Sequence, residues 1–200
     1  MQTSDGQTGR PAVGRRRLPY LWLPVLVLAG LVAYGFARPS PDAATKPARL
    51  GRFSLVSFDG GRISEETLRG HPAVVNLWAS WCAPCKREMP LLERVYRKYR
   101  SSGLIVLGVN VNDSPSDARS FVRAIGVTYP VARDVSGRLS DRIGLFGLPE
   151  TAFVKRDGTL LSLPPGSHRT ARDGTVWLGE LDAKFLEKQI ARLLRKEEET

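Results

Sequence analysis

The sequence holds little cysteine and little histidine, and this scarcity limits the chemistry open to the chain. Cys82 and Cys85 are the only cysteines, and His71 and His168 are the only histidines, among 200 residues. A structural zinc site needs four ligands, and no second cysteine pair is present. Haem attachment to a Cys-x-x-Cys pair needs a histidine directly after it, where Lys86 stands. Redox use of the two thiols is therefore favoured over metal binding, and no metal or other cofactor is expected.

A basic surface with interleaved aromatic residues is also lacking, although the net charge is +10. Residues 1–52 carry eight Lys or Arg against Asp5 and Asp42, whereas residues 53–200 carry 22 basic and 18 acidic residues. Most of the excess charge therefore lies in an N-terminal tail beside an apolar segment. No nucleic-acid partner is expected.

The apolar segment runs without a charge from Leu18 to Ala37, directly after Arg15–Arg17. About 20 residues suffice to cross a bilayer once as a helix. Arginines at one end are expected to stay in the cytoplasm, which places everything after Ala37 on the periplasmic or other extracytoplasmic side. A cleaved signal peptide is the alternative, because residues 35–37 offer small residues at a cleavage site. An uncleaved single-pass anchor in the cytoplasmic membrane is favoured, and both interpretations export the remainder.

Composition then divides the chain into four parts. Residues 1–17 are expected to be a cytoplasmic tail, residues 18–37 the anchor, and residues 38–51 a proline-containing linker. Residues 52–200 have the mixture of apolar and charged residues that is typical of one globular domain.

The two cysteines lie at a predicted junction between a strand and a helix. Residues 73–79 are almost continuously apolar, which is typical of a central strand, and residues 84–100 have helical periodicity. The first thiol then lies at a helix N-terminus, where unpaired N–H groups favour a thiolate. Cys82 is thus the predicted nucleophile and Cys85 the resolving thiol. A purely structural disulfide is disfavoured because so short a loop gains little stability from a crosslink.

The rest of the domain alternates strands with helices, which indicates an α/β fold. Further strands are predicted at 53–58, 104–111 and 129–132, with a hairpin of strands 151–155 and 159–163, and further helices at 64–68, 115–125, 138–143 and 181–196. Residues 164–170, and a tetrapeptide at 156–159 that recurs at 172–175, indicate a second short hairpin arm.

Three features together resemble the active site of the thioredoxin fold. They are the Trp81–Cys85 motif, Pro90 inside the following helix, and the Gly147–Thr151 segment before a strand. The resemblance implies a central mixed sheet flanked by helices. It also implies that Pro149 is a cis-proline packed beside the reactive thiol.

More specifically, Asn76, the Ala83-Pro84 dipeptide, Glu88 and residues 144–151 resemble the membrane-anchored TlpA, ResA and DsbE/CcmG group. This implies an extracytoplasmic thiol:disulfide oxidoreductase that reduces the haem-binding cysteine pair of apocytochrome c, or its haem-ligation carrier. A membrane electron donor would restore the dithiol. The alternative is a thioredoxin-like copper-handling protein.

The resemblance also implies which residues contact the substrate. Leu148 backbone groups are expected to pair with the bound chain, Trp81 to shield the sulfur, and Ala83 and Pro84 to line the contact. Leu148 stands where the DsbE/CcmG branch commonly has alanine, and the 164–174 insert departs from that branch.

A proton acceptor for Cys85 is the remaining requirement. Cytosolic thioredoxins keep a buried aspartate where this chain has Asn76. Glu88 is the first candidate, because it lies three residues after Cys85 on one helix face. Glu150, after the expected cis-proline, is the second. Ala83 and Pro84 supply no charge to stabilise a thiolate, so the dithiol is expected to be a reductant rather than a strong oxidant.

Overall fold

The computed structural model describes residues 23–37, 47–164, 170–171 and 174–195, and the chain divides into two units, residues 1–46 and 47–200. The first unit contains α1 (Leu23–Ala37), a helix without charged residues that lies inside the predicted anchor segment. Residues 18–22 of that segment lie outside the described residues. Within the ranges that the structure describes, no helix is both long and apolar enough to cross a membrane.

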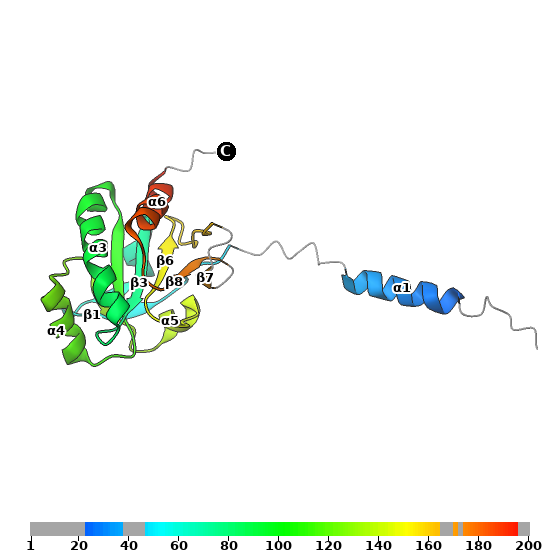
Figure 1. The fold of residues 1–200 in the computed structure, drawn as a ribbon, viewed down its shortest axis with the longest axis horizontal. Helices are drawn as coiled ribbons and strands as arrows, with labels where there is room; N and C mark the ends of the chain where they lie inside the picture. Colours follow the sequence, from blue (N-terminus) through cyan, green and yellow to red (C-terminus); the bar gives the residue numbers. More distant parts are fainter. Residues whose placement is uncertain (1–22, 38–46, 165–169, 172–173, 196–200) are drawn as a thin grey trace, which may run out of the picture. The chain divides into compact units, whose positions relative to one another are not determined.

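The second unit is built on one eight-stranded mixed sheet with the strand order β2-β1-β5-β4-β3-β6-β8-β7 (Figure 1). The strands are β1 (Ser54–Ser57), β2 (Arg62–Ser64), β3 (Ala73–Trp78), β4 (Ile105–Asn110), β5 (Val131–Arg133), β6 (Glu150–Val154), β7 (Thr170–Ala171) and β8 (Val176–Leu178). The helices are α2 (Glu65–Leu68), α3 (Ala83–Tyr99), η2 (Arg100–Ser102), α4 (Pro115–Ile125), α5 (Arg138–Ile143) and α6 (Ala183–Leu194).

Strand β3 lies near the middle of the sheet, parallel to β4 and antiparallel to β6. All six of its side chains are buried, as its continuous apolar character predicts. Because side chains alternate across a strand, Val74, Asn76 and Trp78 point to one face and Val75 and Leu77 to the other. The strand therefore contributes to two separate cores.

The flanking helices divide between the two faces. Side chains from α3, α4 and α6 pack with Val74 and Trp78 in the first core. Side chains from α2 and α5 pack with Val75 and Leu77 in the second. The expected α/β architecture, a mixed sheet between helices, is confirmed.

One predicted hairpin forms only in part, through an antiparallel bridge between Val154 and Leu160 and a hydrogen bond from the Lys155 N–H to Thr159. Residues 159–163 were expected to form the second strand of a hairpin with 151–155, but they make only isolated bridges. The Leu161 N–H donates to Phe153, but the Leu160 N–H donates to Ala48 and the Leu163 N–H to Gly174, so the hydrogen bonds of this segment divide among three neighbours. The strands that pair with β6 along a ladder are β3 on one side and β8 on the other.

Strand β8 belongs to the hairpin arm that the insert predicts. It pairs with β7 on one side and with β6 on the other, so the arm extends the sheet. Residues 165–169 and 172–173 of the insert lie outside the described residues. Strand β2, which pairs with β1, was not predicted.

Candidate active site

The two cysteines form a disulfide where β3 leads into α3, at the predicted junction. Cys82 is the N-cap of α3, and its sulfur accepts the Cys85 N–H at 3.2 Å. Pro84 lies in the first turn, where the missing N–H has no helical partner to lose. The side chains of Cys82 and Cys85 are 4% and 1% exposed. Cys85 is therefore the more buried of the two, although both are nearly closed to solvent.

The loop that precedes β6 contains the predicted cis-proline. The Leu148-Pro149 peptide bond is cis, and Pro149 is buried. The Leu148 side chain packs against the core cluster that contains both cysteines, which brings this loop to the disulfide. The Pro149 carbonyl accepts the Gly179 N–H at 2.8 Å, so the segment after β8 also reaches the loop.

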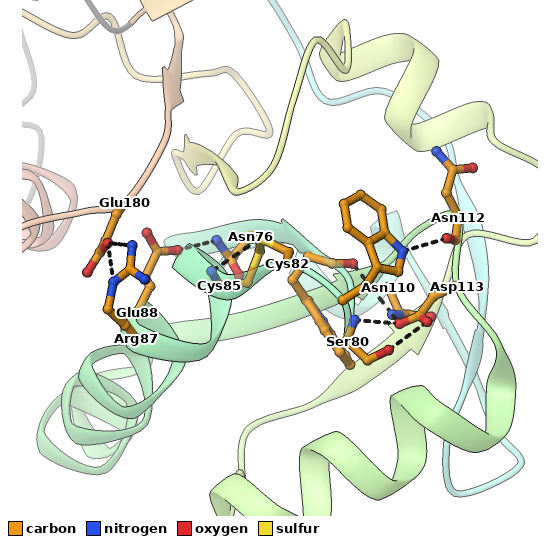
Figure 2. Close-up of a disulfide and its surroundings, with 12 residues drawn as sticks. Asn76, Ser80, Cys82, Cys85, Arg87, Glu88, Asn110, Asn112, Asp113 and Glu180 are labelled. Atoms are coloured by element: carbon orange, nitrogen blue, oxygen red, sulfur yellow. Dashed lines mark hydrogen bonds and ion pairs between the residues drawn. A yellow bond between two sulfur atoms is a disulfide. The ribbon is translucent and has the colours of Figure 1, made fainter.

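Glu88 lies one turn after Cys85 on α3, and its carboxylate is 1% exposed (Figure 2). One carboxylate oxygen accepts a hydrogen bond from the Asn76 side-chain amide at 2.6 Å, and the other accepts the Leu181 N–H at 2.6 Å. The same Asn76 amide nitrogen donates to the Thr151 hydroxyl at 3.0 Å. Two distant segments therefore donate directly to this buried acid, and Asn76 links it to a third, strand β6.

The burial of Glu88 determines its protonation. Desolvation raises the pKa of Glu88 from 4.5 to about 7, although the Leu181 and Asn76 hydrogen bonds oppose the rise. The Glu180 carboxylate also raises this pKa. Figure 2 shows Glu180 paired with Arg87 at the same end of α3, and the ion pair measures 2.7 Å. An acid with a pKa near neutrality can both accept and return a proton at physiological pH.

Glu150, the second predicted acid, lies on the other face of the sheet. It pairs with Leu77 across the β3–β6 ladder, and directly paired residues share a face, whereas Asn76 and Glu88 lie on the opposite one. One oxygen of Glu150 accepts the N–H groups of Phe146 and Gly147 at 2.6 and 2.8 Å. Burial raises the pKa of Glu150, and these two N–H groups oppose the rise. The structure thus brings Glu88 to the dithiol and brings Glu150 to the cis-proline loop.

A polar network that sequence reasoning missed holds the residues before Cys82. Asp113 accepts hydrogen bonds from the Ser80 N–H at 2.6 Å, the Ser80 hydroxyl at 2.8 Å and the Asn110 amide at 2.8 Å. Burial disfavours the ionised form of Asp113, but these bonds and the Ser114 N–H lower its pKa below the usual value. Asp113 follows β4, which runs parallel to β3, and that adjacency was the available signal.

The four predicted substrate contacts differ in exposure. Trp81 and Ala83 are exposed, whereas Pro84 and Leu148 are half-buried. The Trp81 indole N–H donates to the Asn112 carbonyl at 3.0 Å, which fixes the direction of the ring. No hydrogen bond among the described residues engages the Leu148 backbone.

The histidines take no part in this arrangement where the structure describes them. His71 is exposed and lies 3.2 Å from the Gly103 carbonyl, as expected of a surface residue. His168 lies outside the described residues. Among the residues that the structure describes, no group of three or more His, Cys, Asp or Glu side chains could hold a metal ion.

Comparison with known proteins places this geometry among thiol-handling domains. Residues 47–162 match the model of the AhpC/TSA family. The chain is 28% identical over 144 residues to thiol-disulfide oxidoreductase ResA of Bacillus subtilis (strain 168), covering 72% of this chain and 80% of that protein. It is 32% identical over 151 residues to thiol:disulfide interchange protein DsbE of Pseudomonas fluorescens biotype C, again covering 72% and 80%.

Solved structures agree with the sequence relatives. MTB dsbF, solved in mixed oxidized and reduced forms, superposes with a TM-score of 0.62 at 27% identity and covers 74% of this chain and 99% of its own. A thiol:disulfide interchange protein of the thioredoxin family from Chlorobium tepidum TLS has a TM-score of 0.64 at 23% identity, covering 76% and 100%. The predicted thioredoxin-like fold is confirmed.

Proposed function

The chain belongs to the AhpC/TSA family and is a thiol:disulfide oxidoreductase of the ResA and DsbE type, and from this premise we propose that it acts as an extracytoplasmic reductant in cytochrome c maturation. Its client would be the disulfide between the two haem-binding cysteines of apocytochrome c, or a carrier protein that takes part in haem ligation. Reduction would free both client thiols before haem attachment.

The observation that carries the proposal is the buried Glu88 carboxyl beside the resolving cysteine. Cys85 and Glu88 are three residues apart on α3, so they share one face of the helix. A resolving thiol attacks as the thiolate, and a buried thiol needs a nearby base to take its proton. With a pKa of about 7, Glu88 is partly ionised at neutral pH and serves as that base.

The exchange proceeds in two displacements. The Cys82 thiolate attacks one sulfur of the client disulfide, which forms a mixed disulfide and releases the other client sulfur as a thiolate. Cys85 then gives its proton to Glu88 and attacks the Cys82 sulfur, which releases the second client thiolate. Two electrons pass to the client, and the Cys82–Cys85 disulfide forms. A membrane electron donor would then reduce this disulfide.

The loop at the cis-proline supplies the binding geometry in this proposal. The client chain would lie beside Leu148 and form backbone hydrogen bonds with it, as an added strand does. Ala83 and Pro84 would line the approach to Cys82. The Trp81 ring, held by Asn112, would cover the mixed disulfide from water.

The location of the domain belongs to the same proposal. Residues 18–37 would anchor the chain in the cytoplasmic membrane with residues 38–51 as a spacer and the catalytic domain outside. Protease added to intact spheroplasts should then digest the domain, whereas a cytoplasmic marker protein survives. If the domain is protected from the protease in the same cells, it lies on the cytoplasmic side and the proposed location is wrong.

A trapping experiment tests the client. The Cys85→Ala variant of the full chain cannot resolve its mixed disulfide, so it should accumulate a covalent complex with an apocytochrome c or a haem-ligation carrier. The Cys82→Ser/Cys85→Ala double variant is the control and should trap nothing. A deletion strain should lose c-type cytochromes and regain them only with wild-type protein. Normal cytochrome c content in that strain would contradict the proposed client.

A further inference from the structure

The described residues of the second unit expose four large apolar side chains, and three of them lie on loops at the end of the sheet that carries the disulfide. Among its described residues, Trp81, Val135 and Phe146 are 64%, 66% and 86% exposed, and Val56 on β1 is 41% exposed. Trp81 directly precedes Cys82, and Phe146 lies two residues before Leu148, whose side chain packs on the disulfide core. Trp81, Val135 and Phe146 together form the apolar rim.

Topology places the apolar rim at one end of the sheet. Strands β3, β4 and β5 are parallel, so the loops that follow them lie at a common edge, and those after β3 and β5 carry Trp81 and Val135. Strand β6 is antiparallel to β3, so the loop before it, which carries Phe146, reaches that same edge. Val56 lies on β1, and three strands (β5, β4 and β3) lie between β1 and β6 in the sheet.

Two exposed aromatic rings of the rim are on loops that the structure holds firmly. The Asn112 carbonyl fixes Trp81 through its indole N–H. The Phe146 and Gly147 N–H groups both donate to Glu150, whose side chain is completely buried and whose second carboxylate oxygen has no partner among the described residues. Burying a carboxyl group costs free energy unless hydrogen bonds compensate. The two N–H groups of the loop supply such bonds, so Glu150 and the loop conformation depend on each other.

We propose that the apolar rim docks an extended client segment that carries a bulky apolar side chain next to its reactive cysteine. The proposal rests on thiol exchange at Cys82 and names the class of segment that the site prefers. Phe146 is the specificity-determining residue, and Glu150 is a positioning residue that acts through it. A rim that is already ordered loses little conformational freedom when the client binds, so its apolar contact contributes to affinity.

Stopped-flow reduction of two matched peptide disulfides tests this preference. Each peptide is a mixed disulfide with glutathione, and the two differ only in having Phe or Ser before the cysteine. The reduced full chain should react about tenfold faster with the Phe peptide, which corresponds to about 1.4 kcal/mol of apolar contact. Phe146→Ser should abolish this ratio by slowing the reaction with the Phe peptide to the rate of the Ser peptide. Val56→Ser, the matched control, should keep the ratio.

The proposal is overturned if the wild-type chain reduces both peptides equally, or if Val56→Ser lowers the ratio as much as Phe146→Ser does. A second pair of variants separates positioning from general damage. Glu150→Ala removes the acceptor for the loop and should abolish the ratio, whereas Glu150→Gln keeps one acceptor oxygen and should restore most of it. If both Glu150 variants lose the rate ratio, or if neither does, Glu150 does not position the loop.

These outcomes are separate from those of the proposed client. If the chain discriminates between the peptides but the deletion strain has normal cytochrome c content, the docking proposal stands and the cytochrome c proposal fails. If the chain supports cytochrome c maturation but reduces both peptides equally, the cytochrome c proposal stands and the docking proposal fails.

Discussion

The side-chain amide of Asn76 lies 2.6 Å from a carboxylate oxygen of Glu88 and joins the central strand to the helix that carries Cys85 (Figure 2). An amide here stabilises the ionised acid without adding a second negative charge. Together with the Leu181 N–H, it limits how far burial can raise the pKa of Glu88. The contact therefore helps to keep the pKa of Glu88 near neutrality.

Replacing Glu88 by glutamine should slow the release of client from the mixed disulfide. In the wild type, the attack of Cys85 on the mixed disulfide should accelerate as pH rises through about 7, because Glu88 must be ionised to accept the Cys85 proton. The Glu88→Gln rate should fall by about a hundredfold at neutral pH. Its remaining acceleration should move toward the ordinary thiol pKa of about 8.5. Single-turnover quenched-flow across the pH range measures both effects.

Glu93→Gln provides the matched control, because Glu93 is another buried carboxylate on α3. It accepts hydrogen bonds from Thr128 and Arg97, away from the dithiol. Its replacement should leave the pH midpoint of resolution in place. An unchanged pH–rate profile and thiol titration in Glu88→Gln would remove Glu88 from the mechanism.

Glu88 should also make the oxidised protein less stable at neutral pH than in acid. In the unfolded chain this carboxyl ionises near 4.5, whereas in the folded chain it ionises near 7. The folded state thus retains a proton that the unfolded state has lost, and stability falls as pH rises between these values. The decline attributable to Glu88 is about 3 kcal/mol. Urea unfolding should show it in the wild type, and the Glu88→Gln variant should lack it.

Removing the amide of Asn76 should move the same proton transfer to higher pH. Asn76→Ala leaves Glu88 buried with one fewer donor, so the pKa of the carboxyl should rise further. A hydrogen bond to a charged group is worth about 1.5–3 kcal/mol, which corresponds to a rise of about one to two pH units in the resolution midpoint. Gln189→Ala, which removes a buried amide on α6, should leave the midpoint in place. A midpoint that falls in Asn76→Ala would show that the amide does not stabilise the carboxylate.

Asp113 should contribute to the stability of the loop before Cys82. Asp113→Ala removes the acceptor for both Ser80 donors, so the free energy of unfolding should fall by about 2 kcal/mol. The Trp81 fluorescence should change as well, since the neighbouring Asn112 carbonyl holds its indole. Asp117→Ala, which alters an exposed acid in the first turn of α4 that makes no bond to Ser80, is the control and should change neither property. An equal loss in both variants would argue against a specific role for Asp113.

Sequence reasoning succeeded where the signal is local. The Cys82–Cys85 spacing, the helix that follows it and the placement of Glu88 on the same face all depend on neighbours within one or two turns. The cis-proline was predicted because the Gly147–Thr151 pattern matches a known loop. These features are confirmed by the geometry.

The rest depends on contacts between distant segments. The hydrogen bonds of residues 159–163 divide among three neighbours, and no local pattern predicts that β8 would form the longer ladder with β6. Asp113 acts on Ser80 only because β3 and β4 are adjacent and parallel. Glu150 has the residue type of a proton acceptor, and only the strand register shows that it lies on the opposite face from Glu88.

The Leu181 N–H also determines when the site becomes complete during synthesis. Leu181 lies 93 residues after Glu88, so it leaves the ribosome long after both cysteines. In a nascent chain both thiols are therefore present before Glu88 has its peptide donor. A disulfide that forms at that stage would form in a partly assembled protein, before the Leu181 hydrogen bond to Glu88 exists.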